Sequence, residues 1–498
     1  MLILTRIQDR PRIMEIKPTD QQLDIINCDL QPGDVMQVHA FAGTGKTSTL
    51  IAYAQKRPQM GFLYVAFNKS VQTEASVKFP KNVVTKTAHA LAFASHGHRY
   101  RQRLIPDLKA KVVKEALELN SFEEAKFVIE ALKSFLVSAD AKLTLKHVPA
   151  KARAYYRQAD KKLPDIVGAA NKLGKIMHTG SHEAIGVLHD FYLKLYQLSK
   201  PCLNFDCILL DEAQDISPVI SAIVLAPANR GAKILVGDPH QQIYSFRGAL
   251  NSMQKIDAKH RFYLTHSFRF KHNVARVANM ILATFKNESK RLIGYAQAPA
   301  GRKSKKSQYT YIARTNAAVF EKAAEIYRTK RIAFVGGVSG YRLSRIADIY
   351  ALFAGRRRDI KDGFIRSFSR YGELKKYATA VEDFELLAIC KVVESHGVRI
   401  PNLIGAITKQ VVSEKKAEVL LVTAHKAKGL EWPKVHIAPD FPPFVKNGQL
   451  IGQNELEPDE FNLVYVAVTR AMGHLVIDKK SMLNDFIRLM LAKERKVS

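Results

Sequence analysis

The feature that most constrains the fold is a glycine-rich turn between an apolar run and a helical segment. The run VMQVHA ends at residue 40, the turn FAGTGKT follows, and STLIAYAQ has the composition of a helix. A strand that enters a helix through so short a turn is typical of parallel α/β sheets. Similar short apolar runs alternate with helical segments at 61–67, 206–211 and 232–237. The pattern predicts a parallel sheet that is covered by helices on both faces.

The spacing of apolar residues divides the rest of the chain into helical segments and a second α/β segment. From about residue 91 to about residue 195 the apolar residues follow a helical period, which predicts a helical insertion. A second α/β pattern starts near residue 261 with RFYLTH and resumes in QYTYIART, RIAFVGG, VLLVTAH, KVHIAPD and HLVIDK. We therefore expect two α/β domains, each with a mainly helical insertion. The first α/β domain is expected at 1–90 and 196–260, with its insertion at 91–195. The second is expected at 261–340 and 416–498, with its insertion at 341–415.

The charge of the chain indicates what kind of partner it binds. Its 498 residues include 77 Lys and Arg against 46 Asp and Glu, a formal charge of +31, and its 47% apolar residues exclude wholesale disorder. This surplus favours a polyanionic partner, with nucleic acid ahead of an anionic membrane surface. Four cysteines without a CxxC pair argue against a zinc site and a disulfide framework. Because no signal peptide or long apolar stretch is present, we expect an intracellular protein without a membrane span.

The glycine-rich turn has the spacing of a phosphate-binding P-loop, with Ala40 in place of the first glycine. Two glycines let successive backbone N–H groups point at phosphate oxygens. Lys46 can reach the β- and γ-phosphates, and the Thr47 hydroxyl can bind Mg²⁺. An ordinary strand-to-helix turn is the weaker alternative. The residues expected to hold the nucleotide here are Ala42, Gly43, Thr44, Gly45, Lys46, Thr47 and Ser48.

A second motif supports this interpretation. The segment CILLDEAQD (207–215) is an apolar strand that ends in adjacent acids, which places Asp211 at the carboxyl edge of the sheet beside the P-loop. There Asp211 can bind the Mg²⁺ shell, and Glu212 can orient or deprotonate an attacking water. A solvated acidic turn is the alternative, but the P-loop upstream makes it the weaker one. The two motifs together predict hydrolysis of a nucleoside triphosphate.

Further motifs carry a family resemblance. The run VGDPHQQIYSFRGA (236–249) resembles motif III of the UvrD/Rep/PcrA branch of superfamily 1 helicases. The other motifs of that branch follow in order, from a Q motif to a motif VI. PTDQQ (18–22) resembles the adenine-reading Q motif, and TAHALAF (87–93) resembles a DNA-contact motif of the first domain. LTHSFR (264–269) resembles motif IV, VTAHKAKGLEW (422–432) motif V and NLVYVAVTRA (462–471) motif VI. The resemblance implies two RecA-like domains.

Within this branch the sequence looks most like the F-box DNA helicase subgroup. The similarity lies in AFNK (66–69), in the VAVTRA form of motif VI, and in the small second insertion. No segment resembles an F-box. The resemblance covers nearly the whole chain, from about residue 17 to about residue 480.

The resemblance assigns nucleotide contacts outside the P-loop. Gln22 would read the adenine edge, and Phe268 would stack on the adenine where relatives usually have Tyr. Glu431 would also contact the nucleotide. Ser48 departs from the family, in which Arg commonly follows the GKT.

Three further residues would act on the γ-phosphate. Gln241 would contact this group or its attacking water. Arg269 and Arg470, both expected in the second α/β domain, would act as arginine fingers. Because phosphoryl transfer needs positive charge around the γ-oxygens, supplying it from a second domain makes hydrolysis depend on closure of the cleft.

A motor on nucleic acid needs contacts that accept any base, and aromatic faces provide them. Tyr244, Phe246 and Arg247 come directly after Gln241 and would grip single-stranded DNA. On pattern alone, Phe67 would more often be a core residue. The other segments that resemble DNA-contact motifs contribute Phe67, Asn68, His89, Thr423 and His425.

The combined prediction is an ATP-dependent DNA helicase or translocase that uses Mg²⁺. The family implies movement 3′→5′ on single-stranded DNA and unwinding at single/double-strand junctions, in replication, repair or recombination. Single-strand-binding or recombinase proteins are candidate partners of a monomeric core, which would act in the cytoplasm and nucleoid, or in a eukaryotic nucleus. A protein-stripping translocase with little unwinding, an ATP-switched DNA-binding protein and an RNA substrate are the alternatives.

Overall fold

The computed structural model describes residues 17–158, 162–243, 253, 256–295, 308–380 and 383–497. A six-stranded sheet forms the centre of the first half (residues 17–264), with strand order β3–β2–β6–β7–β1–β8 and all neighbours parallel. Its strands are β1 (Val35–Ala40), β2 (Phe62–Ala66), β3 (Val83–Thr87), β6 (Cys207–Leu210), β7 (Ala232–Gly237) and β8 (His260–Leu264).

Side chains alternate between the two faces of this sheet along each strand, and both faces are buried under other elements. In β6, Cys207 and Leu209 pack under three helices on one face, whereas Ile208 and Leu210 pack into the core of the first insertion. The three helices are α1 (Asp20–Asn27), α2 (Lys46–Gln55) and α3 (Lys69–Lys78), and α10 (Pro218–Val224) lies on the insertion side. The sheet is therefore inaccessible except at its edges.

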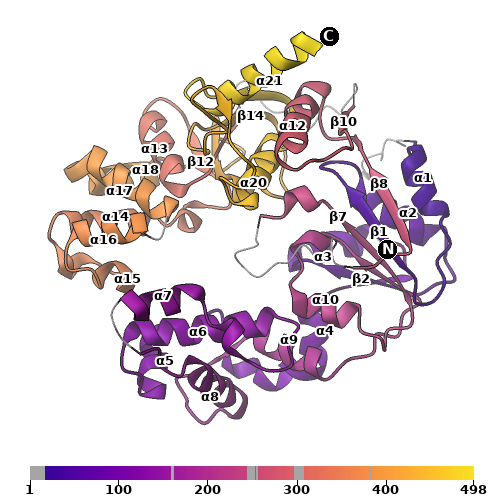
Figure 1. Ribbon diagram of the computed structural model, residues 1–498, viewed down its shortest axis with the longest axis horizontal. Coiled ribbons are helices and arrows are strands. Elements are labelled where there is room, and N and C mark those ends of the chain that lie inside the picture. Colours follow the sequence, from indigo (N-terminus) through magenta and orange to yellow (C-terminus); the bar gives the residue numbers. More distant parts are fainter. Residues whose placement is uncertain are drawn as a thin grey trace, which may run out of the picture.

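The first insertion follows β3 and is almost entirely helical (Figure 1). A short π-helix and a 3₁₀ turn (93–103) follow its first helix, and a two-stranded ladder of β4 (Leu104–Ile105) and β5 (Val187–Leu188) ties its ends together. Its helices are α4 (Ala88–Ala92), α5 (Ala110–Leu117), α6 (Phe122–Val137), α7 (Ala150–Gln158), α8 (Ile166–Thr179) and α9 (His189–Leu198).

The second half (residues 265–497) has a five-stranded parallel sheet of order β12–β13–β11–β14–β17. Its strands are β11 (Tyr309–Ala313), β12 (Ile332–Phe334), β13 (Val419–Thr423), β14 (Trp432–Ile437) and β17 (Ala471–Ile477). Two small ladders accompany it, β9 (His266–Ser267) with β10 (Ile293–Gly294) and β15 (Val445–Lys446) with β16 (Gln449–Leu450). The accompanying helices are α12 (His272–Phe285), α13 (Asn316–Ile326), α19 (Ala424–Ala427), α20 (Pro458–Val468) and α21 (Leu483–Val497).

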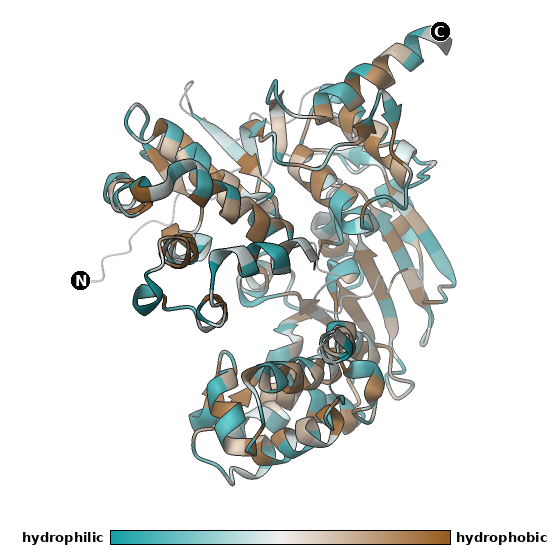
Figure 2. Cartoon of the chain, turned by 60° about the vertical axis from the view of Figure 1, so that its left-hand side comes forward, coloured by the Kyte–Doolittle hydropathy of each residue, from teal (hydrophilic) through white to brown (hydrophobic). Residues whose placement is uncertain are grey.

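The second insertion lies between β12 and β13 and comes close to the first (Figure 1). The Lys126 ammonium in α6 lies 4.8 Å from the ring centre of Phe364 in the second insertion. Hydrophobic residues line the strands and inner helix faces, whereas hydrophilic residues lie mostly on outer faces (Figure 2). The helices of the second insertion are α14 (Leu343–Phe353), α15 (Gly363–Arg366), α16 (Tyr371–Ala380), α17 (Phe384–His396) and α18 (Ile400–Gln410).

The predicted fold class of two parallel-sheet α/β units with mainly helical insertions is confirmed. One strand differs from the prediction: RFYLTH was assigned to the second α/β pattern, but β8 joins the first sheet beside β1. The reason is that a strand signal does not specify a partner, and the Tyr263 ring of β8 stacks on His39 of β1 at 5.2 Å. All four cysteines are free thiols. Among the described residues no helix is long and apolar enough to cross a membrane.

Candidate functional site

The predicted nucleotide residues meet at the carboxyl edge of the first sheet. Strand β7 lies between β6 and β1, and their register pairs Leu210 with Leu235 and His39 with Gly237. Because carboxyl ends of parallel strands share one edge, the segments that follow these three strands lie next to each other. Those segments are the P-loop, the Asp211–Glu212 pair and the motif III segment from Asp238 onward.

The P-loop backbone explains its two glycines. Gly43 and Gly45 have φ of 76° and 78°, a left-handed conformation that disfavours other residues, and α2 begins directly afterwards. A Cβ added to Gly43 would lie 2.5 Å from Cβ of Arg269 and 2.6 Å from Oγ of Ser267. The Phe268 N–H also donates to the Gly43 carbonyl at 2.8 Å. The segment 267–269 therefore forms a wall directly against the P-loop.

Thr47 and Asp211 lie together at the N-terminus of α2. The Thr47 hydroxyl and the Tyr64 hydroxyl each donate to Oδ2 of Asp211 at 2.9 Å. Burial and the neighbouring Glu212 raise the pKa of Asp211 above its ordinary value, because both disfavour the charged carboxylate, and a bound cation would offset this effect. A hydroxyl and a carboxylate side by side are the oxygen ligands that Mg²⁺ prefers, and these two residues fit the ion.

Glu212 faces the P-loop lysine. Its backbone is left-handed, with φ 51° and ψ 41°, and its Oε2 lies 3.9 Å from Nζ of Lys46. The Gln214 amide donates to the same oxygen at 2.6 Å. Burial opposes ionisation of Glu212, but the positive charges of Lys46 and Lys428 outweigh it and lower the pKa of this carboxyl. The carboxylate is therefore ionised and oriented, as a group that positions or deprotonates water must be.

Gln241 and Arg470 meet across the two halves. The Arg470 guanidinium is 1% exposed and donates to Oε1 of Gln241 at 3.2 Å. The Gln241 amide in turn donates to Oδ2 of Asp238 at 2.6 Å. Burial and the nearby Arg269 lower the pKa of Arg470 to about 9, so at neutral pH the guanidinium is still charged.

Arg269 and Glu431 contact one another. Nε of Arg269 donates to Oε2 of Glu431 at 2.6 Å, and its NH1 reaches the Thr469 carbonyl at 3.4 Å. Both residues were predicted as separate nucleotide contacts. In this structure the two side chains form an ion pair, so each neutralises the charge of the other. Arg269 itself belongs to the wall of residues 267–269 against the P-loop.

The predicted adenine contacts lie beside Gly45. The Gln22 amide donates to Thr49 at 3.0 Å, while its oxygen accepts from the Thr19 N–H that caps α1. A Cβ on Gly45 would lie 2.9 Å from Nε2 of Gln22 and 3.5 Å from the Phe268 ring. The Phe268 ring is half-buried, and the ring of Tyr295 is 5.8 Å from it. Tyr295 is an aromatic neighbour of this position that no sequence motif indicated.

The remaining P-loop residues differ in accessibility. Ala42 and Thr44 are buried, and the Thr44 hydroxyl donates to the Phe41 carbonyl at 2.8 Å. Ser48 is exposed on the first turn of α2.

Three of the predicted DNA contacts lie at the carboxyl ends of β2 and β3, which the register aligns through Ala66 and Thr87. Phe67 is 44% exposed, so the alternative interpretation as a core residue is wrong. Asn68 caps α3 by accepting from the Val71 N–H at 2.9 Å, and Nε2 of His89 bonds Oδ1 of Asp190 at 2.9 Å.

The other predicted DNA contacts belong to motif V and motif III. Thr423 is buried at the end of β13, and His425 is half-buried on α19. Tyr244, Phe246 and Arg247 lie outside the described residues.

Sequence reasoning missed Lys428 and Tyr465, which lie in the motif V and motif VI segments. Lys428 forms an ion pair with the buried Asp215 of the first half and donates to the Gln241 carbonyl. Burial raises the pKa of Asp215 to about 6 even though Lys428 opposes the shift. The partners of Lys428 are about two hundred residues away in the chain, so no local pattern could identify this contact.

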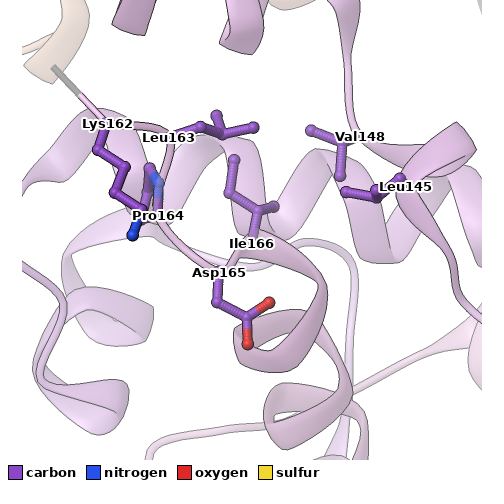
Figure 3. A pocket seen from close by; sticks show the side chains of 7 residues that line it. All are labelled: Leu145, Val148, Lys162, Leu163, Pro164, Asp165 and Ile166. Carbon is purple, nitrogen blue, oxygen red and sulfur yellow. The ribbon is translucent and has the colours of Figure 1, made fainter.

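A separate cavity of about 520 Å³ lies in the first insertion (Figure 3). None of the predicted site residues lines it, and Asp165 at its rim caps α8 by accepting from the Gly168 N–H at 2.8 Å. This cavity is therefore distinct from the nucleotide site. Its lining residues are Leu145, Val148, Lys162, Leu163, Pro164, Asp165 and Ile166.

Known proteins resemble both halves of the chain. A family model described as the UvrD/REP helicase N-terminal domain matches residues 19–261, and one described as the UvrD-like helicase C-terminal domain matches residues 306–481. Together these two matches take in most of the chain.

Individual relatives agree with these matches. F-box DNA helicase 1 of Gallus gallus is 38% identical over 504 residues, which cover 94% of this chain and 49% of the relative. F-box DNA helicase protein 1 of Schizosaccharomyces pombe is 29% identical over 529 residues, which cover 96% of this chain and 58% of the relative. The chain thus spans about half the length of the curated relatives it matches. This similarity is consistent with the F-box helicase subgroup, and the chain belongs to the UvrD-like helicase family.

Proposed function

We propose that the chain is an ATP-driven DNA motor in which hydrolysis depends on contact between its two halves. The observation that carries the proposal is the hydrogen bond from Arg470 of the second half to Gln241 of the first. Gln241 follows the strand next to the P-loop strand, so the bond lies at the place where a γ-phosphate would meet both halves. The DNA helicases named among the relatives support DNA as the substrate.

Each residue of the site has a chemical task in this proposal. Lys46 and the P-loop N–H groups hold the phosphates, and Thr47 and Asp211 hold Mg²⁺, which would neutralise phosphate charge when bound. Glu212 orients a water for attack on the γ-phosphorus and accepts its proton. Arg470 and Arg269 stabilise the charge that develops on the γ-oxygens.

Opening and closing of the halves would alternate the grip on successive bases. Phe67, Asn68 and His89 in the first half and Thr423 and His425 in the second are the proposed contacts to single-stranded DNA. The family resemblance supports movement 3′→5′ and unwinding of duplex at a junction. Such a motor would act wherever the cell keeps its DNA, in a nucleus or a nucleoid.

The first test is single-strand-stimulated ATPase activity. Lys46→Ala should abolish it, because the phosphates lose their only lysine of the loop. Lys56→Ala is the matched control, since Lys56 lies at the other end of α2, where its ammonium donates to the Asn27 side chain at 2.7 Å. DNA binding without any ATPase activity in the wild type would contradict the motor and favour an ATP-switched DNA-binding protein.

The second test is unwinding of duplexes with a 3′ or a 5′ single-stranded tail. We expect unwinding from the 3′ tail, and unwinding only from a 5′ tail would contradict the proposed polarity. Stimulated ATPase without unwinding would favour the protein-stripping translocase, which displacement of a recombinase filament would then detect. The same assays with single-stranded RNA measure the preference for DNA.

A further inference from the structure

Tyr465 takes part in the contact between the halves. It lies on α20, its side chain is fully buried, and its hydroxyl reaches the first half at two points. The hydroxyl oxygen accepts from the Ala42 N–H of the P-loop at 3.2 Å and donates to Oδ2 of Asp238 at 3.0 Å. One atom of the second half thus joins the P-loop to the segment that contains Gln241.

Asp238 connects Tyr465 to Gln241 by hydrogen bonds. Its Oδ2 accepts from both the Tyr465 hydroxyl and the Gln241 amide, the latter at 2.6 Å. Its Oδ1 accepts from the His240 N–H at 3.0 Å. This bond fixes the carboxylate against the backbone two residues further along the chain. The orientation of Gln241 is therefore set by a carboxylate that Tyr465 helps to fix.

A second contact from the same helix supports the arrangement. Asn462, one turn before Tyr465, donates to the Gln242 carbonyl at 2.7 Å. Residues three apart lie on one face of a helix, so this face of α20 binds the 238–242 segment at two successive points. The segment is thus held from the second half on both sides of Gln241.

The hydroxyl can carry out both roles only while it keeps its proton. Burial, and then the nearby Asp238 charge, raise the pKa of Tyr465 well above the ordinary value, so the group stays protonated at any physiological pH. Asp238 is the acceptor of this proton, and the Ala42 N–H supplies the second hydrogen bond.

We propose that Tyr465 is a positioning residue for ATP hydrolysis, whose hydroxyl places Gln241 for the γ-phosphate only when the halves are in contact. This inference rests on the proposed function. Among the described P-loop residues, the Tyr465 hydroxyl bonds the N–H of Ala42 and not Lys46 or Thr47, which would hold the phosphates and Mg²⁺. It therefore acts on the rate of hydrolysis through Asp238 and Gln241 rather than on nucleotide affinity.

The test is Tyr465→Phe, which removes the hydroxyl and keeps the ring that packs edge-on against His240 at 6.1 Å. We expect kcat of the DNA-stimulated ATPase to fall about tenfold, while KM for ATP changes less than twofold, because a buried polar contact is lost outside the nucleotide cradle. A merely structural role would lower the melting temperature and leave kcat unchanged.

Tyr341→Phe is the matched control. Tyr341 is also fully buried, and its hydroxyl also makes two hydrogen bonds, to the carbonyls of Val335 and Leu421 at 2.9 and 3.1 Å. We expect it to lower the melting temperature by an amount similar to Tyr465→Phe and to leave kcat within twofold of the wild type.

A double-mutant cycle with Asp238→Asn tests the route. If Tyr465 acts through Asp238, the two losses in kcat should be far from multiplicative, because the second change removes a contact that is already broken. Multiplicative losses, or a Tyr465→Phe variant with wild-type kcat, would overturn the inference while leaving the motor intact. A wild type without DNA-stimulated ATPase would instead overturn the proposed function, and the role of Tyr465 with it.

Discussion

Arg470 donates a hydrogen bond of 3.2 Å to Oε1 of Gln241, a residue 229 positions away in the other half of the chain. Its Nε also holds the Val466 carbonyl, and its NH1 the Leu430 carbonyl, so the guanidinium is fixed on three sides. A buried guanidinium with so many partners is oriented before any nucleotide arrives. Such preorganised charge is what lowers the barrier to phosphoryl transfer.

The first prediction concerns this arginine. Arg470→Gln should lower kcat of the DNA-stimulated ATPase by a factor of about 100 or more, because the charge near the γ-oxygens is lost. Steady-state kinetics at saturating DNA measure the change. Arg57→Gln is the control, because Arg57 is equally a buried arginine with backbone partners, Ile26 and Cys28, but lies outside the site. A similar loss of kcat in both variants would show that instability, not lost charge, is the cause.

The second prediction concerns the wall of the P-loop. Gly43→Ala should abolish binding of a fluorescent ATP analogue, because the added Cβ would displace Ser267 and Arg269. Gly33→Ala is the control: Gly33 has φ of 87°, but within the described part of the chain no neighbour lies within 4 Å of an added Cβ. It should cost only the backbone strain, about 1–2 kcal/mol, and keep the affinity for the analogue. Equal affinity of the two variants for the analogue would contradict the conclusion that residues 267–269 pack tightly against Gly43.

The third prediction concerns DNA affinity. Phe67→Ala should weaken binding of single-stranded DNA by roughly 5- to 150-fold, since stacking of one base contributes about 1–3 kcal/mol. KM for ATP should not change. Phe353→Ala removes a ring that is 45% exposed, against 44% for Phe67, and should leave the affinity within twofold. Fluorescence anisotropy with a labelled oligonucleotide decides, and equal losses in both variants would contradict a specific contact.

The fourth prediction concerns acid sensitivity. Burial, and then the neighbouring Lys434 and Lys322, lower the pKa of His436 to about 4 from 6.5. Between these values the unfolded chain binds the proton first, so this group destabilises the fold as the pH falls from about 6.5 to about 4. The full shift corresponds to roughly 3 kcal/mol, and solvent screening of the half-buried ring makes the loss smaller than this.

The His436→Phe variant should lack this loss. The new ring can still stack on Tyr309, whose ring centre lies 4.1 Å from that of His436. The melting temperature of the variant should therefore fall less than that of the wild type between pH 6.5 and pH 4. Parallel curves for the two proteins would show that His436 does not titrate in this range.

The parts of the fold that a local pattern specifies could be predicted from the sequence. The P-loop and CILLD strands were located because each pairs an apolar run with residues that have a chemical use at its end. The helical insertions were expected because the apolar residues of these segments follow a helical period. Phe67 was placed less well, because a strand-end aromatic has the same local pattern whether it is buried or exposed.

The contacts between the halves could not be predicted in this way. The hydrogen bond from Arg470 to Gln241 joins segments 229 residues apart, and both residues looked like separate ligands for one nucleotide. The link from Tyr465 to Ala42 joins segments 423 residues apart, and a tyrosine on an apolar helix looks like core. Such contacts depend on how two complete sheets dock, a relation that no short pattern encodes.

The wall formed by residues 267–269 is also the place where the chain crosses from one half to the other. The Phe41 N–H binds the Leu264 carbonyl at the start of this crossing, and the Lys271 N–H binds the Met472 carbonyl of the second half at its end. The crossing is thus anchored to a different half at each end and lies over Gly43 between them. A nucleotide bound at the P-loop would therefore lie directly beside the segment that joins the halves. Its binding and the angle between the halves are coupled through this one segment, without any intermediate element.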